Sequence, residues 1–203
     1  MTVSNLPPPA VSLLYSQTER PTDGKLVERT LAGQRQAFDE LIRRYQRQAI
    51  AVSYRLLGNT QDAMDITQEA FLKAFANLGS LQKSEAFGGW LMRIVANLSL
   101  NFRRGRKLRS QLSLDASVDG NDGTSTDGRV DPVRQMQSAE MGERLQEALG
   151  ELTDKQRTAI VLFTIEQMPQ KQVADTLGCS VEAVKWHVFQ GRKRLKEILK
   201  DYL

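Results

Sequence analysis

The sequence contains a single cysteine, Cys179, and a single histidine, His187. One thiol can form neither an internal disulfide nor a zinc site made of several cysteines, which is in keeping with a reducing cytosol. One imidazole also excludes a metal centre built from several histidines. We therefore expect no bound metal and no other cofactor.

The chain also lacks the signals of membrane proteins and of the common enzyme classes. No stretch approaches the about 18 consecutive apolar residues of a membrane-spanning helix, and the N-terminus has no basic start followed by an apolar core. A glycine-rich phosphate loop and a nucleophile elbow are both missing. We expect a cytoplasmic protein that is not inserted in a membrane, is not an enzyme and has no catalytic residues.

The sequence contains many charged residues, and basic ones cluster in two segments. Hydrophobic residues make up 40% of the chain and charged residues 26%, which is typical of a globular protein. The net charge of +4 and the isoelectric point near 9.3 permit a nucleic-acid partner without requiring one. Basic residues gather at 103–109 and again at 192–196.

The last third of the chain, residues 152–200, has the pattern of a helix-turn-helix. Thr153 and Gln156 predict a capping box at the start of one helix. A short second helix should end at Gly178, and Ser180 should cap a longer third helix that is rich in Lys and Arg. Two helices across a short turn, the second of them basic, indicate DNA binding, and an ordinary small helical bundle is the alternative.

Residues 59–78 predict an amphipathic helix with three carboxylates on one face. Asp62, Asp65 and Glu69 stand at positions i, i+3 and i+7, with Gln68 beside them. Catalytic carboxylates would converge from separate elements, whereas acids in line on one helix form either a solvated face or a docking surface. The spacing alone leaves both interpretations open.

Residues 87–107 combine aromatic residues that can pack inward with a polar and basic stripe. Arg93, Asn97, Asn101 and Arg104 recur at steps of four, four and three residues. Such a stripe beside aromatic rings suits a single-stranded nucleic acid, which needs stacking surfaces, base-edge partners and phosphate contacts. The alternative is an aromatic core with a solvated polar face.

Two further helices are expected before these segments. Asp23 is predicted to cap a short helix over residues 24–31, and a longer amphipathic helix follows it and stops at Gly58.

Composition divides the chain into two small helical domains, and the expected fold class is all-α. Residues 1–21 are predicted to be a mobile N-terminal tail, 22–108 the first domain and 138–203 the second. Between the domains, residues 109–137 are rich in Gly, Asp, Ser and Thr, which predicts a flexible acidic linker.

Three of these segments resemble the extracytoplasmic-function (ECF) group of bacterial RNA polymerase sigma factors. The family's core-polymerase-binding helix is similar to the stretch DAMDITQEAFLKAF (62–75). The segment that melts and reads the −10 promoter element is similar to FGGWLMRIVANLSLNFRR (87–104), and the −35-reading domain resembles residues 152–196. Each match alone recurs widely, but all three in this order, split by a linker, are specific. The first domain is then sigma-2-like, and the second is a sigma-4-like helix-turn-helix domain.

The resemblance implies a role for each candidate residue. The β′ and β subunits of core RNA polymerase would be bound by Asp62, Asp65, Gln68 and Glu69. The −10 strand of the promoter DNA would be bound by Arg93, Asn97, Asn101, Arg104 and Arg106, while the loop at 82–86 captures a flipped base. The −35 duplex would be bound by Ser180, Glu182, Lys185, Trp186, Phe189 and Gln190, with Arg192 and Lys193 on phosphates.

Some positions depart from the family's usual residues. Gly88 and Gly89 stand where bulkier polar residues are common, Asn101 where Asp is common, and Gln190 where Arg is common. The promoter preferences of relatives therefore cannot be transferred to this chain. Trp186 either meets DNA or packs within its own domain.

A second class of protein also fits part of the sequence. The stretch LTDKQR…VKWH resembles the helix-turn-helix module of LuxR-type transcription regulators. Such a regulator would carry a sensor or receiver domain ahead of that module, and the first half lacks the alternating strand–helix pattern of a receiver. We expect instead a promoter-recognition subunit, associated with the nucleoid through polymerase and held inactive by an anti-sigma partner.

Overall fold

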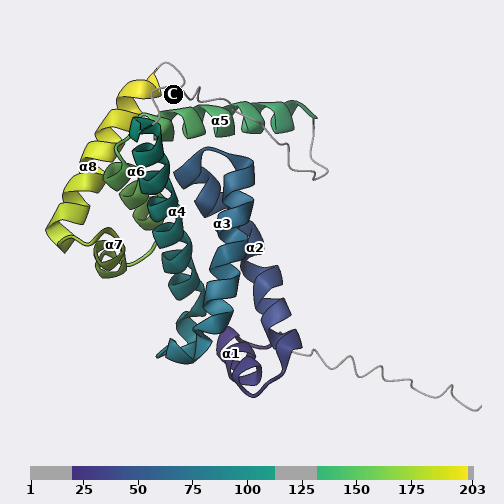
Figure 1. Ribbon diagram of the computed structural model, residues 1–203. Coiled ribbons are helices and arrows are strands. Elements are labelled where there is room, and N and C mark those ends of the chain that lie inside the picture. Colours follow the sequence, from purple (N-terminus) through teal and green to yellow (C-terminus); the bar gives the residue numbers. More distant parts are fainter. Residues whose placement is uncertain (1–19, 113–131, 201–203) are drawn as a thin grey trace, which may run out of the picture.

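The computed structural model describes residues 20–112 and 132–200, and every element in these ranges is a helix (Figure 1). In chain order the elements are α1 (Asp23–Leu31), α2 (Arg35–Leu57), α3 (Thr60–Ala76), the short 3-10 helices η1 (Leu78–Ser80) and η2 (Ser84–Ala86), α4 (Phe87–Leu112), α5 (Pro132–Gly150), α6 (Asp154–Ala159), the π-helical segment η3 (Ile160–Ile165), α7 (Gln170–Leu177) and α8 (Val181–Ile198). The all-α fold class is confirmed. The predicted N-terminal tail lies almost wholly outside the described residues.

The elements from α1 to α4, here called the front group, enclose an apolar and aromatic core. α2, α3 and α4 pack against one another, and α1 crosses one end of them (Figure 1). Phe38 meets the rings of Phe75 and Phe87 edge-on, with centroids 5.0 and 6.2 Å apart. Phe87 is completely buried. Edge-to-face packing of this kind adds to the free energy that the buried apolar area contributes.

The elements from α5 to α8, here called the rear group, contain the predicted helix-turn-helix. The capping box of Thr153 and Gln156 is confirmed at the start of α6. α7 ends at Gly178, whose φ of 60° is in the left-handed region. Ser180 caps α8 by accepting a hydrogen bond from the Ala183 amide at 3.1 Å. Each of these local features forms as the sequence predicts.

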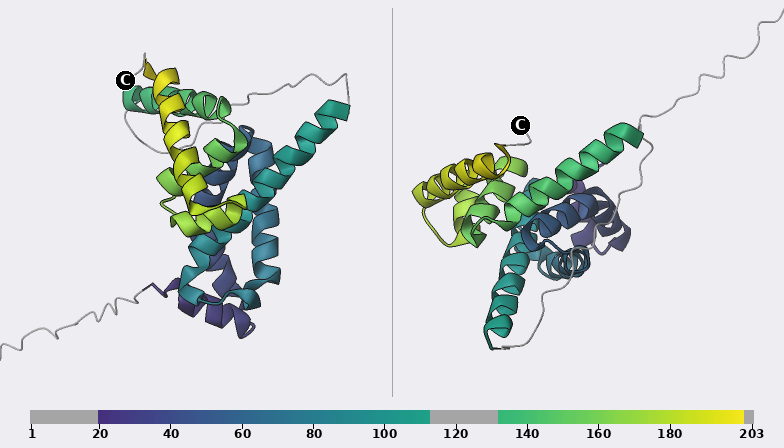
Figure 2. Two further views of the ribbon diagram at one scale, coloured as in Figure 1. Left: turned by 90° about the vertical axis from the view of Figure 1, so that its left-hand side faces the viewer. Right: turned by 90° about the horizontal axis from the view of Figure 1, so that it is seen from above.

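The two groups pack directly against each other, with the rear group along one side of α2 and α4 (Figure 2). The contact centres on the C-terminal end of α2. There the Leu56 carbonyl accepts hydrogen bonds from Arg103 Nη1 at 2.8 Å and Arg157 Nη1 at 3.2 Å. Arg103 also pairs with Asp154 of the rear group at 2.7 Å. Burial lowers the pKa of the Arg103 guanidinium, and Asp154 opposes that effect.

A second polar contact joins the groups through Glu166, which follows η3. Its carboxylate pairs with Arg55 Nη1 at 3.4 Å and accepts a hydrogen bond from Gln48 Nε2 at 2.5 Å. The Glu166 side chain is 6% exposed. The rear group therefore meets the front group through charged and amide side chains as well as through apolar ones.

Helices extend into both ends of the predicted linker. α4 continues to Leu112 and α5 begins at Pro132, so of the predicted linker residues 113–131 lie outside the described ranges. The physical reason is local, because residues 109–112 contain neither Gly nor Asp and proline is favoured in the first turn of a helix. Within the described residues, none of the helices is both long enough and apolar enough to cross a bilayer.

Candidate functional site

α3 carries the residues predicted to bind polymerase. Asp65 and Glu69 are exposed on its surface. Asp62 is more enclosed, because its side chain is 24% exposed and pairs with Arg106 of α4 at 3.3 Å. Glu69 pairs with Lys73 of the same helix at 2.8 Å, so two of the three carboxylates already have an intramolecular counter-ion.

An apolar stripe on α3, which sequence reasoning did not select, lies beside these acids. Met64, Leu72 and Phe75 are 51%, 64% and 45% exposed. Together with the exposed Gln68 they follow the three- and four-residue spacing of one helix face. The available signal was the presence of apolar residues outside the predicted inward-facing set. Exposed apolar side chains next to carboxylates are typical of a protein–protein interface.

α4 presents the predicted polar stripe as one continuous face. Arg93, Asn97, Asn101 and Arg104 are all exposed. Arg106 does not belong to this stripe, because two residues beyond Arg104 the helix has turned by about 200°. Its guanidinium points toward α3 and Asp62 instead. The structure therefore brings together four of the five residues predicted to contact the −10 strand.

The α3–α4 loop, residues 77–86, contains the segment predicted to capture a base, residues 82–86. Its two ends are fixed in the core by Leu78 and Phe87, which are 2% and 0% exposed. Gln82 and Lys83 are exposed between these anchors. The loop thus presents an amide and an ammonium group at the end of α4 where the polar stripe begins.

α8 turns a polar and aromatic face away from its domain. The exposed residues on it include Glu182, Lys185, Trp186, Phe189 and Lys193. Trp186 and Phe189 are 54% and 64% exposed, so neither ring packs inside the domain. Exposed aromatic and basic side chains on the second helix of a helix-turn-helix can reach base edges, thymine methyl groups and phosphates.

Two of the predicted α8 residues are more constrained than the others. Gln190 is half-buried, and Arg192 Nη2 donates a hydrogen bond to Thr164 Oγ1 at 3.3 Å. The hydroxyl of Ser180 is already used by the helix cap. A phosphate contact from Arg192 would have to compete with its bond to Thr164.

His187 lies at the edge of a cavity of about 510 Å³ between α8, the start of α6 and the end of α4. The Trp186 ring lies against the imidazole, with centroids 5.1 Å apart. Burial and the neighbouring Lys155 lower the pKa of His187. The imidazole is therefore neutral near pH 7. Nowhere in the described residues do three or more His, Cys, Asp or Glu side chains gather as metal ligands would.

The chain matches two family models. Residues 41–109 match sigma-70 region 2, and residues 142–195 match sigma-70, region 4. α3, the α3–α4 loop and the polar stripe all lie within the first match, and α6, α7 and most of α8 lie within the second.

Similar proteins that match nearly the whole chain are also sigma factors. The ECF RNA polymerase sigma factor SigW of Bacillus subtilis is 33% identical over 87% of this chain and 96% of its own length. The RNA polymerase sigma-H factor of Pseudomonas aeruginosa is 30% identical over 89% of this chain and 95% of its own length. Among solved structures, the sigma factor RpoE of Bartonella quintana, in complex with the anti-sigma factor NepR, has a similar fold, with a TM-score of 0.65 and 24% identity over 80% of this chain and 96% of that one. The chain belongs to the ECF group of RNA polymerase sigma factors.

Proposed function

We propose that this chain binds core RNA polymerase and directs it to promoters by holding the −10 strand with residues 22–108 and the −35 duplex with residues 138–203. The observation that carries the proposal is the combination, in one sigma-family chain, of an exposed acidic and apolar α3, an exposed polar stripe on α4 and a capped basic α8. The front half matches sigma-70 region 2, which is not the sensor or receiver domain expected of a LuxR-type regulator.

α3 is the proposed polymerase-docking element. Asp65 and Glu69 supply a negative potential that would steer the encounter with a basic surface of the β′ subunit and fix its register. Met64 and Leu72 add apolar area that leaves water on binding. Asp62 contributes less, because it is more enclosed than Glu69, although both are paired, Asp62 with Arg106 and Glu69 with Lys73.

The polar stripe of α4 and the α3–α4 loop are proposed to hold the opened −10 strand. Arg93 and Arg104 would contact phosphates, while Asn97 and Asn101 offer amide groups to base edges. Unpairing a base costs a few kcal/mol, which stacking and edge contacts in the protein offset. The protein needs no nucleotide hydrolysis in this scheme, because binding the open strand better than the duplex already shifts the equilibrium toward melting.

α8 is proposed to enter the major groove of the −35 element. Lys185, Trp186 and Phe189 lie near its N-terminal half, where a recognition helix meets base edges. Lys193 and Arg192 lie further along, where phosphate contacts set orientation without reading sequence. We further expect an anti-sigma partner, as in the complex of the Bartonella quintana sigma factor with NepR. We also expect a cytoplasmic location.

Run-off transcription tests the whole proposal. Core polymerase without a sigma subunit would be incubated with a promoter library, with and without the purified chain. We expect discrete, sequence-dependent start sites only when the chain is present. Transcripts that require some other sigma factor in addition to this chain would contradict the proposal.

The docking assignment has its own test. Asp65→Lys should weaken the affinity for core polymerase by at least about tenfold, because it places like charges together. Glu28→Lys is the matched control, since Glu28 is an exposed acid on α1, away from α3. Equal core affinity for the two variants would remove α3 from the interface.

A further inference from the structure

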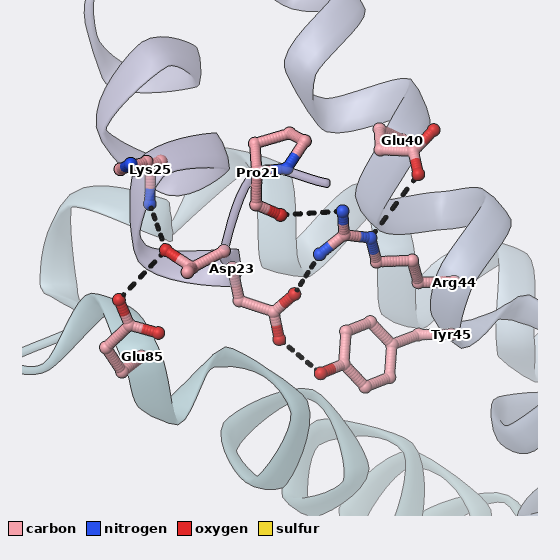
Figure 3. A network of polar contacts seen from close by, with 8 residues as sticks. Pro21, Asp23, Lys25, Glu40, Arg44, Tyr45 and Glu85 are labelled. Atoms are coloured by element: carbon pink, nitrogen blue, oxygen red, sulfur yellow. Dashed lines mark hydrogen bonds and ion pairs between the residues drawn. The ribbon is translucent and has the colours of Figure 1, made fainter. Parts of the chain in front are cut away.

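A polar network ties the α3–α4 loop to the first turn of α1 (Figure 3). Thr22 is the N-cap of α1, and its hydroxyl accepts a hydrogen bond from the Lys25 amide at 3.3 Å. The same hydroxyl donates its proton to Glu85 Oε1 at 3.1 Å. Glu85 belongs to η2, the last turn of the loop. The cap of one helix therefore also holds the end of the loop.

Asp23 extends the network to α2 and does not act as the predicted cap. Thr22 takes that role, while Asp23 is the first helical residue. Its carboxylate pairs with Arg44 Nη1 at 2.9 Å and accepts a short hydrogen bond from the Tyr45 hydroxyl. Arg44 also donates to the Pro21 carbonyl at 2.7 Å. The first turn of α1 is thereby fixed on α2.

Tyr45 carries the network on to the beginning of α4. Its ring lies 5.6 Å from the ring of Phe87, between centroids, and beside Gly88. Burial and the bond to Asp23 raise the pKa of Tyr45 to about 12, so the hydroxyl remains a hydrogen-bond donor at any physiological pH.

Two glycines lie where side chains of the network come closest to the backbone. A Cβ at Gly24 would collide with the Glu85 carboxylate. A Cβ at Gly88 would lie 2.7 Å from the Tyr45 hydroxyl oxygen. The Tyr45 ring fills the space that a side chain at Gly88 would need. The network and the two glycines form one unit.

We propose that Asp23, Tyr45 and Glu85 are positioning residues that set where the α3–α4 loop holds Gln82 and Lys83 relative to the polar stripe of α4. Gln82 and Lys83 are exposed. The residues that follow them are held at two points: Glu85 bonds to Thr22, and the Phe87 ring packs against the ring of Tyr45. Releasing the Thr22–Glu85 bond would free the loop directly, and releasing the Tyr45–Asp23 bond would loosen the turn of α1 that holds Glu85; neither bond involves a residue of the stripe. The inference rests on the proposed role of the loop in capturing a −10 base.

The test compares two variants of the network, called clamp variants (Tyr45→Phe and Glu85→Ala), with two variants of the loop (Gln82→Ala and Lys83→Ala). Each is tested in the full-length chain bound to core polymerase. Gln82→Ala and Lys83→Ala identify the −10 position whose base preference depends on the loop. Tyr45→Phe and Glu85→Ala should then flatten the preference at that same position and lower transcription from the preferred promoter by about tenfold, since small misplacements of a positioned group are costly. Core affinity and −35 duplex affinity should stay unchanged.

Two matched variants separate positioning from simple destabilisation. Glu85→Gln keeps an oxygen that accepts the Thr22 hydroxyl proton, so it should retain the base preference that Glu85→Ala loses. Gln34→Ala removes an exposed hydrogen bond, from Arg29 Nε at 3.0 Å, near the other end of α1, and it should behave as wild type.

Each outcome decides the question. Clamp variants that keep the wild-type base preference, or that lower transcription equally on every −10 sequence, would overturn the positioning role while the loop's own role stands. If Gln82→Ala and Lys83→Ala leave every −10 preference unchanged, the loop does not read DNA and the positioning role falls with it. The docking and −35 assignments would survive that result.

Discussion

The front and rear groups stabilise their interiors with different chemistry. In the front group, the rings of Phe38, Phe71, Phe75 and Phe87 pack edge to face. In the rear group, a charged side chain, Arg157, is only 4% exposed. Its guanidinium donates to the carbonyls of Leu149 and Gly150 at the end of α5 and to that of Leu56 at the end of α2.

The difference shows what each kind of contact can do. Rings that interlock inside one group lose their packing altogether if the group opens. A guanidinium at the ends of two helices satisfies carbonyls that have no partner within their own helix, and water can replace it when the surface becomes exposed. The front group therefore has a ring cluster of its own, whereas the contact between the groups includes polar bonds that hydration can replace.

The largest effect is expected from truncating the central ring of the front core. Phe87→Ala should lower the free energy of unfolding by about 3–5 kcal/mol, because it removes a completely buried ring and leaves a cavity. Phe189→Ala is the matched control and should change it by less than about 0.5 kcal/mol, since that ring is exposed. Urea unfolding of the full chain measures both values. Similar losses for the two variants would break the comparison.

Removing the buried guanidinium should have the next largest effect. Arg157→Met leaves the Gly150 carbonyl without this donor, while the Leu149 carbonyl keeps its bond from the Leu152 amide at 3.2 Å and Leu56 keeps its bond from Arg103. We expect a loss of about 1–3 kcal/mol, which is the cost of one buried polar group left unsatisfied. Arg194→Met removes an exposed arginine of α8 and should be nearly neutral. An Arg157 variant as stable as this control would show that apolar packing alone holds the rear group.

Changes on α8 should weaken binding to the −35 duplex and leave binding to the −10 strand unaffected. Lys185→Ala should weaken binding to the −35 duplex by about 1–3 kcal/mol and relax its sequence preference, whereas Arg192→Ala should weaken binding to all duplexes about equally. Neither change should alter binding to a single-stranded −10 oligonucleotide, because both lie in the rear group. Fluorescence anisotropy with specific and scrambled duplexes measures these losses, and a parallel loss on the single strand would contradict the division of labour.

The smallest effect concerns pH. Because the pKa of His187 in the folded chain lies below its ordinary value of about 6.5, the stability linked to its neutral form is present above that pH and is lost as the pH falls through the folded pKa. The charged groups that face the imidazole across the cavity are Lys155, Lys107 and Asp154. His187→Gln should therefore lose less Tm than the wild type between pH 7 and pH 5. Identical Tm profiles would show that the imidazole titrates alike in both states.

Local features of the molecule could be predicted from the sequence, whereas contacts across it could not. The caps at Thr153 and Ser180 depend on residues three positions away, so their spacing was sufficient. The residues around Arg157 in the sequence did not indicate that its side chain is buried. One of its partners is the backbone carbonyl of Leu56, which is 101 residues away in the chain. The π-helical turns of η3 and the pairing of Arg106 with Asp62 likewise depend on neighbours from other parts of the fold.

In the candidate site, too, features within one helix could be predicted and contacts between helices could not. Helical periodicity was enough to place Arg93, Asn97, Asn101 and Arg104 on one exposed face. Arg106 was not part of that period, and it lies on the side of the helix that faces α3. The network around Asp23 joins three helices and a loop, so no single stretch of sequence contains its pattern.

The contact between Arg157 and the end of α2 limits what the packed molecule can reach. By their names, the −10 and −35 elements are about 25 base pairs apart, which is about 85 Å along the duplex axis at about 3.4 Å per step. α4 and α7 touch in the packed arrangement, so one packed molecule cannot span that length. The 19 residues from 113 to 131 can extend over about 60 Å, enough with the helices themselves to bridge the gap. If both elements are bound at once, the two groups would have to separate, and the apparent affinity for DNA would then scale with the fraction of molecules that are open.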